Sequence, residues 1–161
     1  MHWRIRVARP DDAAEVHKVI VAALRETNAR DYAASVIARL EESFGPAEVQ
    51  SMIDTRKSFV AVEDDEGAGS RIVGTAALDG SVVRTVFVAP DVQGKGVGRL
   101  LMAEVEKASR EAGVEILTVP ASLTGEPFYA KLGFEAVRET FYEEARTIIM
   151  ERSLGEGPAA R

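Results

Sequence analysis

Cysteine is absent from this chain of 161 residues, and no long hydrophobic run occurs in it. The missing thiols exclude disulfides, zinc–cysteine sites and a nucleophilic cysteine, and they fit a cytoplasmic protein. No apolar stretch approaches the roughly 20 residues that a membrane-spanning helix needs. The net charge of −6, from 20 Lys and Arg against 26 Asp and Glu, argues against general nucleic-acid binding. We therefore expect a cytoplasmic protein that contacts neither nucleic acid nor a membrane and holds no metal.

The length is that of one domain, which we expect to cover residues 1–154, with residues 155–161 as a disordered tail. Apolar periodicity and turn residues predict strands at 1–7, 58–63, 71–78, 82–88, 115–119, 134–139 and 146–152. They predict helices at 10–24, 32–40, 47–55, 97–112 and 126–132. This order implies an α/β fold with a mixed sheet and helices on both of its faces.

The most informative segment is Gln-Gly-Lys-Gly-Val-Gly at residues 93–98, between a predicted strand and a predicted helix. Glycines let the backbone turn tightly and leave no side chain to keep a ligand away. The start of the next helix adds free N–H groups and the positive end of its dipole. Together these features predict a cradle for an anion, most often a phosphate.

Two common phosphate-binding loops do not fit this segment. A dinucleotide fingerprint needs a third glycine three residues after the second, and Arg99 holds that place. A mononucleotide P-loop needs Ser or Thr after Gly-Lys, whereas Gly96 follows Lys95. The loop must therefore serve a different phosphorylated ligand.

What does fit is Gln93-x-x-Gly96-x-Gly98, which resembles the acyl-CoA signature of the GCN5-related N-acetyltransferase (GNAT) family. A second element, Phe128-Tyr129-x-Lys131-Leu132-Gly133-Phe134, looks like the family's Tyr-x-x-x-Gly-Phe motif. The resemblance implies a three-layer α/β/α sandwich with a mostly antiparallel sheet. In such a fold two parallel strands, here 82–88 and 115–119, splay apart around the thioester arm of acetyl-CoA.

The resemblance assigns the cofactor to particular residues. Backbone groups of Phe87 and Val88 would contact the pantetheine arm and the acetyl carbonyl, and a set of turn amides would take the pyrophosphate: Gly94, Gly96, Val97, Gly98 and Arg99. The side chains of Lys95 and Arg99 would add positive charge, or simply form a solvated helix start. Gln93 stands where arginine is commoner in the family. Ser122 stands where the family often has Asn and would bond the pantetheine amide.

Tyr129 is the candidate for a chemical role. When an amine attacks a thioester, a thiolate leaves, and a nearby phenol can protonate it. Tyr129 occupies the position of the family's tyrosine. The alternative role is packing beside Phe128 and Phe134.

The general base and the acceptor site are less well marked. The strand 115–119 has no carboxylate after Glu115, which leaves Asp79, Glu26, Asp31 and His17 as possible bases. In the family, the segments after the first helix and between the last two strands cover the acceptor. Here they carry Glu26, Asp31, Tyr32, Phe141, Tyr142, Glu143 and Glu144. Aromatic rings and carboxylates suit a cationic amine, although polar loops of this kind are often only solvated.

The leading hypothesis is therefore an enzyme that transfers acetyl from acetyl-CoA to a primary amine by direct attack in a ternary complex. One alternative is a regulatory module that binds an acyl-CoA without transferring it. Another is an unrelated α/β domain with a chance glycine turn, which leaves the Gly133-Phe134 element unexplained. The expected partners are acetyl-CoA and an amine acceptor, and a homodimer stays open.

Overall fold

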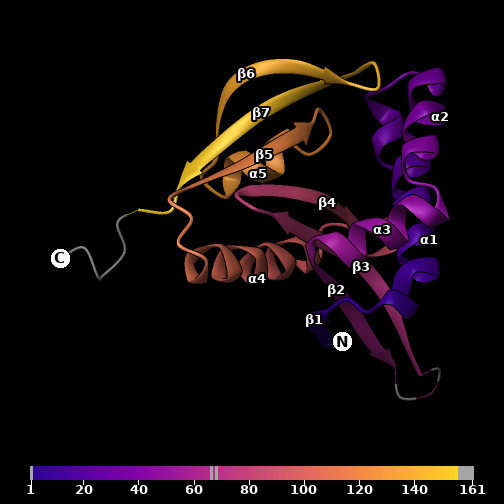
Figure 1. The fold of residues 1–161 in the computed structure, drawn as a ribbon. Helices are drawn as coiled ribbons and strands as arrows, with labels where there is room; N and C mark the ends of the chain where they lie inside the picture. Colours follow the sequence, from indigo (N-terminus) through magenta and orange to yellow (C-terminus); the bar gives the residue numbers. More distant parts are fainter. Residues whose placement is uncertain (1, 66, 68, 156–161) are drawn as a thin grey trace.

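The computed structural model describes residues 2–65, 67 and 69–155 (Figure 1). Apart from Gly155, the predicted tail lies outside these residues. Seven strands form one sheet in the order β1-β2-β3-β4-β5-β7-β6. The strands are β1 (His2–Val7), β2 (Lys57–Asp65), β3 (Gly69–Asp79), β4 (Val82–Val88), β5 (Ile116–Ser122), β6 (Glu135–Tyr142) and β7 (Ala145–Ser153). Every pairing in this sheet is antiparallel except the one between β4 and β5.

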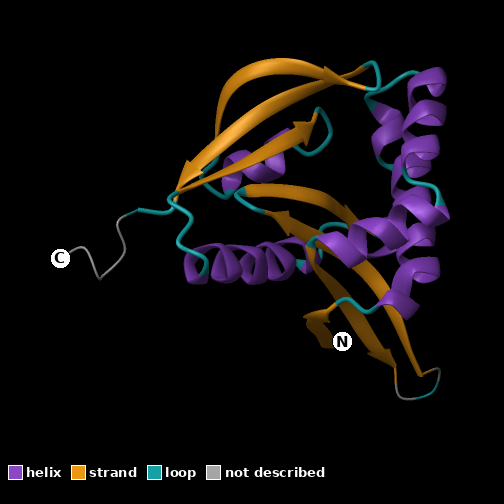
Figure 2. Ribbon diagram, in the orientation of Figure 1, coloured by secondary structure: helices purple, strands orange, loops and turns teal. Residues whose placement is uncertain are grey.

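The helices form layers on the two faces of the sheet (Figures 1 and 2). They are α1 (Ala13–Glu26), α2 (Ala34–Ser43), α3 (Pro46–Thr55), α4 (Val97–Glu111) and α5 (Glu126–Lys131). Helices α1, α2 and α3 cover one face, and α4 and α5 pack against the other. The result is the α/β/α sandwich with a mixed sheet that the sequence predicted. No helix in the described part of the chain is long and apolar enough to cross a membrane.

Alternation along the strands divides the core between the two faces. In β2, Phe59 and Ala61 belong to the cluster under α4, whereas Val60 and Val62 belong to the cluster under α1. Successive side chains of a strand point to opposite faces, so one apolar run fills both clusters. This burial on both sides holds the middle of the sheet rigid beneath the candidate site.

Helix α4 lies close against the sheet because β3 carries a glycine beneath it. A Cβ at Gly74 would lie 3.0 Å from Leu101 Cδ1 and 3.1 Å from Val97 Cγ1, too near for a side chain. The buried residues of α4 recur at helical spacing, at Val97, Leu101, Met102 and Val105. This contact places the N-terminus of α4, and the glycine turn before it, at the end of β4.

Strand β5 is longer than predicted, because it continues through Pro120 to Ser122. The amide of Thr118 donates to Ser81 O on the β4 side. Residues two apart in a strand point their N–H groups the same way, so the nitrogen of Pro120 also faces β4. Its pairing with Ile149 of β7 needs no N–H at that position. Proline is therefore tolerated inside this strand, and the prediction that β5 ends at 119 was wrong.

The segment between the last two strands also differs from the prediction. Instead of a loop, β6 and β7 meet in a two-residue turn at Glu143 and Glu144, both at positive φ. Phe141 and Tyr142 belong to β6 itself. The β6–β7 hairpin reaches toward α2 (Figure 1), where Glu144 and Arg39 form an ion pair of 3.3 Å.

Candidate active site

The central parallel strands are paired at one end only. The structure pairs β4 with β5 through Val82 and Thr118, supported by the bond from the Thr118 amide to Ser81 O, 3.0 Å. Beyond this point the described strands have no registered pairs, and they diverge toward their carboxyl ends. The backbone groups of β4 that face β5 are therefore left without a strand partner. An extended ligand can use such groups as a neighbouring strand would.

A bulge changes the direction of β4 inside this opening. The register with β3 shifts between Thr75 and Ala77, and Thr85 on the bulged strand has φ 56°. Positive φ at a β-branched residue is strained, and such strain gathers at functional positions. The bulge places Val83, Val86 and Val88 on the α4 side. Phe87 points to the opposite face, where its ring meets Phe44 edge-on at 5.4 Å between centroids.

The glycine turn at the end of β4 presents a set of unused amides. Gly94 and Gly96 have φ of 76° and 96°, which glycine adopts without strain. The Lys95 amide donates to Val92 O, and the Leu100 amide to Gly96 O. Within the described part of the chain, five amides around them have no backbone acceptor: Gly94, Gly96, Val97, Gly98 and Arg99. They are the amides that the sequence analysis assigned to a pyrophosphate.

Side chains around the turn hold its shape. Gln93 Nε2 donates to Val88 O over 3.1 Å and so links the turn to the end of β4. Gly98 is glycine for a packing reason, because a Cβ there would lie 3.1 Å from the Phe128 ring. Lys95 and Arg99 are exposed. Arg99 also lines a small hollow of about 150 Å³ between α4 and α5, beside Arg152.

Tyr129 lies in α5, with its ring in the core under the sheet. The ring stands edge-on to Phe128 and Phe134, with centroid separations of 5.1 and 5.7 Å. No described residue forms a hydrogen bond with the Tyr129 hydroxyl. Among the described residues, the one fully buried side-chain nitrogen or oxygen without a hydrogen-bond partner is Arg84 Nε, so the Tyr129 oxygen is not in that class. The phenol oxygen of Tyr129 is therefore not completely enclosed, although the residue is buried. Burial raises the pKa of Tyr129 far above its ordinary value of 10.0, so the group stays protonated.

Ser122 is positioned next to Tyr129 by a glycine. The Gly125 amide donates to Ser122 Oγ over 2.9 Å. A Cβ at Gly125 would lie 3.2 Å from Ser122 Oγ and 3.3 Å from Tyr129 Cε2. The small residue thus keeps the tyrosine ring close to the serine. The Ser122 oxygen is in use as an acceptor, which leaves its O–H free to donate.

The predicted acceptor residues divide into two groups. Tyr32 Oη donates to Arg146 O over 2.7 Å and accepts from the Leu123 amide over 2.8 Å. Asp31 accepts from Thr124 Oγ1 over 2.7 Å. These bonds tie the segment before α2 to the β5–α5 loop, so Asp31 and Tyr32 join two parts of the fold. Glu26 and Tyr142 are exposed, and their side chains make no hydrogen bond or ion pair with another described residue.

The structure adds two residues that the sequence analysis missed, Arg56 and Arg84. Arg84 sits in β4 two residues beyond the Val82–Thr118 pair and points to the α1–α3 face, opposite Val83. Arg56 follows α3, and its Nη1 donates to Thr85 Oγ1 over 2.9 Å. The sequence did contain a signal for Arg84, because it is the single charged residue in the largely apolar strand Val-Val-Arg-Thr-Val-Phe-Val.

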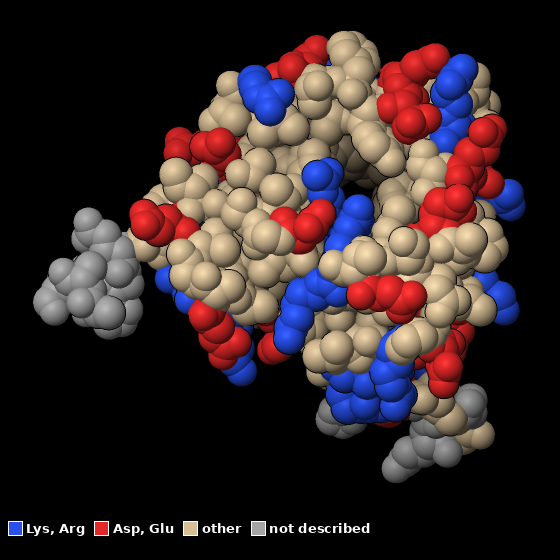
Figure 3. Space-filling model, viewed as in Figure 1, with Lys and Arg blue, Asp and Glu red and all other residues tan. Residues whose placement is uncertain are grey.

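The charges near this point are mostly positive. Burial lowers the pKa of Arg56, and the neighbouring Arg84 guanidinium lowers it further, while Asp79 and Tyr142 act in the opposite sense. Asp79 is exposed and lies 3.9 Å from Arg56 Nε. Two of the candidate general bases can be placed here. Asp79 lies beside the Arg56 guanidinium, and His17 is half-buried in α1. In the view of Figure 3, the molecule is hollowed near its centre, and Lys and Arg side chains lie beside the hollow.

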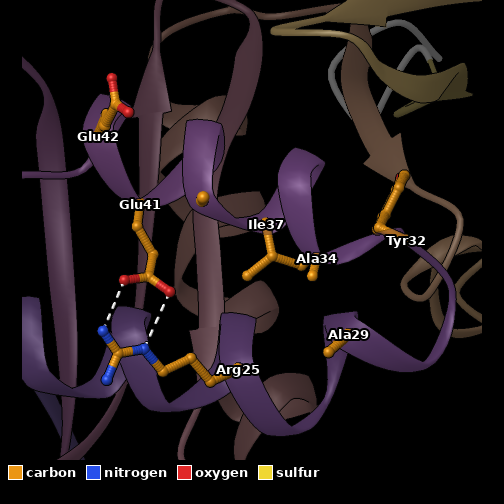
Figure 4. Close-up of a pocket in the computed structure, with 8 residues that line it drawn as sticks. Arg25, Ala29, Tyr32, Ala34, Ile37, Glu41 and Glu42 are labelled. Carbon is orange, nitrogen blue, oxygen red and sulfur yellow. Dashed lines mark hydrogen bonds and ion pairs between the residues drawn. The ribbon is translucent and has the colours of Figure 1, made fainter.

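A larger hollow, of about 670 Å³, lies away from the splayed strands between α1 and α2 (Figure 4). Arg25 and Glu41 point toward each other across it and form an ion pair of 2.8 Å. The rest of its lining is mostly alanine and other small or apolar side chains. Its one described ion pair, between Arg25 and Glu41, is already formed, and the hollow lies apart from the glycine turn and Tyr129, so we do not place the active site there.

Comparison with known proteins agrees with this arrangement. The family model for the acetyltransferase (GNAT) domain matches residues 28–153. A GCN5-related N-acetyltransferase structure from Rhodopseudomonas palustris is 26% identical and superposes with a TM-score of 0.86, covering 96% of this chain and 97% of that one.

Two ligand-bound structures share the fold at lower identity. The PaiA N-acetyltransferase of Thermoplasma acidophilum, in complex with coenzyme A, is 18% identical with a TM-score of 0.75, over 95% of this chain and 99% of its own. YncA of Salmonella typhimurium, with its cofactor acetyl-CoA, is 18% identical with a TM-score of 0.64, over 97% of this chain and 96% of its own. With the family model matching well over half of its residues, the chain belongs to the GNAT acetyltransferase family.

Proposed function

We propose that this protein transfers the acetyl group of acetyl-CoA to a primary amine, by direct attack in a ternary complex. The observation that carries the proposal is the set of five unpaired amides at the N-terminus of α4, next to the open side of β4. The amides suit the pyrophosphate, because they add hydrogen bonds to the positive end of the helix dipole. The open strand edge suits the pantetheine arm, since it can bond amide groups of the arm.

The position of the thioester follows from these two anchors. The pyrophosphate would lie at the carboxyl end of β4, so the arm would run toward the closed end of the opening at Val82 and Thr118. Phe87 and Val88 would contact the arm and the acetyl carbonyl. The presence of coenzyme A or acetyl-CoA in two structures with this fold supports a site for the cofactor in this chain.

Chemistry in the opening would need one acid. The amine nitrogen attacks the thioester carbonyl carbon, the C–S bond breaks, and the sulfur leaves as a thiolate. Tyr129 would give the thiolate a proton, because burial holds its phenol neutral, and the resulting tyrosinate would take a proton back from water before the next turnover. The acetylated nitrogen loses its own proton to water, since no carboxylate of the described residues has been placed in the opening.

The first test is whether the folded protein binds the cofactor. Acetyl-CoA should raise the melting temperature, because a ligand bound only by the native state stabilises it by mass action. Coenzyme A should do the same, and acetate alone should do little. An unchanged transition at saturating acetyl-CoA would show that the amides do not form the cofactor site.

The second test is transfer itself. Release of the coenzyme A thiol should be followed with a panel of amines, amino acids, peptides and aminoglycosides, and the product mass should increase by one acetyl group. Thermal stabilisation without thiol release from any amine would favour an acyl-CoA-binding module instead.

A further inference from the structure

Arg84 is unusual among the half-buried arginines of the described residues because it has no acidic partner. Among the described residues it makes no hydrogen bond or ion pair, and its Nε is buried and unpaired. The other half-buried arginines are paired, as Arg6 is with Asp12 at 2.8 Å and Arg152 with Glu106 at 2.7 Å. Among the described residues, Arg84 Nε is the one buried side-chain nitrogen or oxygen without a hydrogen-bond partner, and the terminal nitrogens of this guanidinium, which also lack a partner, are not completely buried.

Arg56 is placed so that its charge adds to that of Arg84. Its hydrogen bond to Thr85 Oγ1, 2.9 Å, fixes it beside the bulge of β4. The carboxylate paired with it is that of Asp79, whose Oδ2 lies 3.9 Å from Arg56 Nε. About half of the Asp79 side chain is exposed to solvent. The two guanidiniums are close enough that Arg84 lowers the pKa of Arg56. Two like charges in a half-buried site are unfavourable until an anion lies between them.

The pair lies where an acceptor must approach. Arg84 is two residues from the closed end of the opening, about 7 Å along the strand, and points to the face away from α4 and α5. Under the proposed function the cofactor fills the opening from the α4 end, so the acceptor reaches the thioester from the α1–α3 face. Figure 3 shows a hollow near the centre of the molecule, with basic side chains next to it.

We infer that the acceptor is an amine that also carries an anionic group, a carboxylate or a phosphate, and that Arg84 and Arg56 bind this group. The inference rests on the proposed function, and it names the substrate class. A guanidinium fork can hold either anion with two hydrogen bonds. The amine then points from the anchored anion toward the thioester.

This inference reverses the expectation drawn from the sequence, in which carboxylates attract a cationic amine. Asp31 accepts a hydrogen bond from Thr124, and Tyr32 bonds the β5–α5 loop, so both residues have a role in joining two parts of the fold. The half-buried charge without a partner beside the splayed strands, that of Arg84, is positive. It suits an anion on the acceptor.

Matched acceptors test the inference directly. One set is glycine, β-alanine, 4-aminobutanoate and 5-aminopentanoate, which differ in the distance between amine and carboxylate. The second set is the carboxamides of the same compounds, and the third is aminoalkyl phosphates of similar length. We expect at least one anionic amine to exceed its neutral counterpart in kcat/KM by roughly 10–100-fold, as for a charge-assisted hydrogen bond. The carboxylate and phosphate sets show which anion is preferred.

Variants show whether the arginines are responsible. Arg84→Gln should lower kcat/KM for the anionic acceptor far more than for its neutral amide and so remove most of that preference, and Arg56→Gln should do so in part. Arg4→Gln is the control, because Arg4 pairs with Asp64 on β1 and β2, away from the opening. Equal losses for anionic and neutral acceptors, or a tenfold loss of acetyl-CoA affinity in Arg84→Gln, would overturn the inference.

A readout without turnover keeps the two proposals separate. The Nε–H signal of Arg84 in ¹H–¹⁵N spectra, assigned by its loss in Arg84→Gln, should shift when anionic amines are added to the coenzyme A complex. The neutral amides should leave it unmoved. If no amine is acetylated, the proposed function fails while this signal still reports the anion site. Absence of a shift with every carboxylate and phosphate of the panel would refute the anion site itself.

Discussion

The amide of Thr118 donates to the carbonyl of Ser81 over 3.0 Å, and this bond marks the point from which the two central strands diverge. The next N–H facing β4 would belong to residue 120, which is proline. Proline has no donor to offer. The strands therefore cannot continue their pairing at this position even if they approach each other.

Pro120 and Ala121 should respond oppositely to substitution. Pro120→Ala adds an N–H that faces the opening and breaks no hydrogen bond. The free energy of unfolding should fall by only about 1 kcal/mol or less, because alanine gives the unfolded chain more conformational freedom than proline. Ala121→Pro removes an N–H on the β7 side, opposite Ile148, and should cost at least about 2 kcal/mol. Urea denaturation of both variants measures the difference. Similar losses in both would show that the edge assignment of residue 120 is wrong.

Gly96→Val should weaken acetyl-CoA binding beyond its effect on stability. Gly96 has φ 96°, so valine there is strained by about 1–3 kcal/mol, and its side chain would also keep the pyrophosphate away from the amides. Gly113→Val is the matched control. Gly113 has φ 80°, also borders α4 and also has open space at its Cβ, but it lies at the other end of the helix.

Both glycine variants should lose comparable stability in thermal unfolding, and only Gly96→Val should lose cofactor affinity in calorimetric titration. Normal acetyl-CoA binding by a folded Gly96→Val protein would contradict the placement of the pyrophosphate.

Tyr129→Phe tests the proposed acid. The change removes one oxygen and keeps the ring contacts with Phe128 and Phe134. Loss of a general acid should lower kcat by about 10²–10⁴-fold, with the dissociation constant of acetyl-CoA nearly unchanged. Thiol release with an accepted amine measures the rate. If the variant keeps a rate within a factor of a few, Tyr129 only packs, and the proton reaches sulfur through water.

Asp12 should contribute stability that is lost in acid. Its carboxylate accepts two bonds from Arg6, 2.8 and 3.0 Å, and one from the Arg9 amide, 2.7 Å. The Arg6 guanidinium holds the pKa of Asp12 below its ordinary 3.8, against the opposing effect of burial. The contribution is therefore complete above that ordinary value and disappears as the pH falls through the lower, folded value.

Asp12→Asn should be less stable at neutral pH by about 2–3 kcal/mol, the range for a broken, largely buried pair. The difference between the two proteins should narrow as the pH falls below 3.8. Denaturation at a series of pH values measures it. A constant gap down to the lowest pH would mean that the carboxylate charge contributes nothing.

The glycine turn illustrates what local sequence can predict. Glycines at 94 and 96, flanked by a strand and a helix, dictate a tight turn with free amides wherever the segment lies, because the conformation depends on neighbouring residues only. The same holds for the buried stripe of α4 and for the closing glycine of α5. The family motifs therefore indicated both the fold and the location of the turn correctly.

The acceptor side could not be predicted in this way. Arg56 and Arg84 are 28 positions apart, and they meet because α3 packs over the face on which β4 places Arg84. Asp31 and Tyr32 were predicted at the acceptor site from their place in the sequence, yet they bond a loop about 90 residues later in the chain, with separations of 93 and 91. Such contacts depend on how layers are packed, and sequence spacing does not encode them.

The sequence by itself thus determined the order of helices and strands, the phosphate-type turn and the tyrosine of α5, since each depends on local periodicity or a short motif. Only the tertiary structure decided which charges are neutralised. It paired most arginines with carboxylates from other elements and left Arg84 at the splayed strands without one. The reason is that Coulomb interactions act through space, between groups that the fold alone brings together.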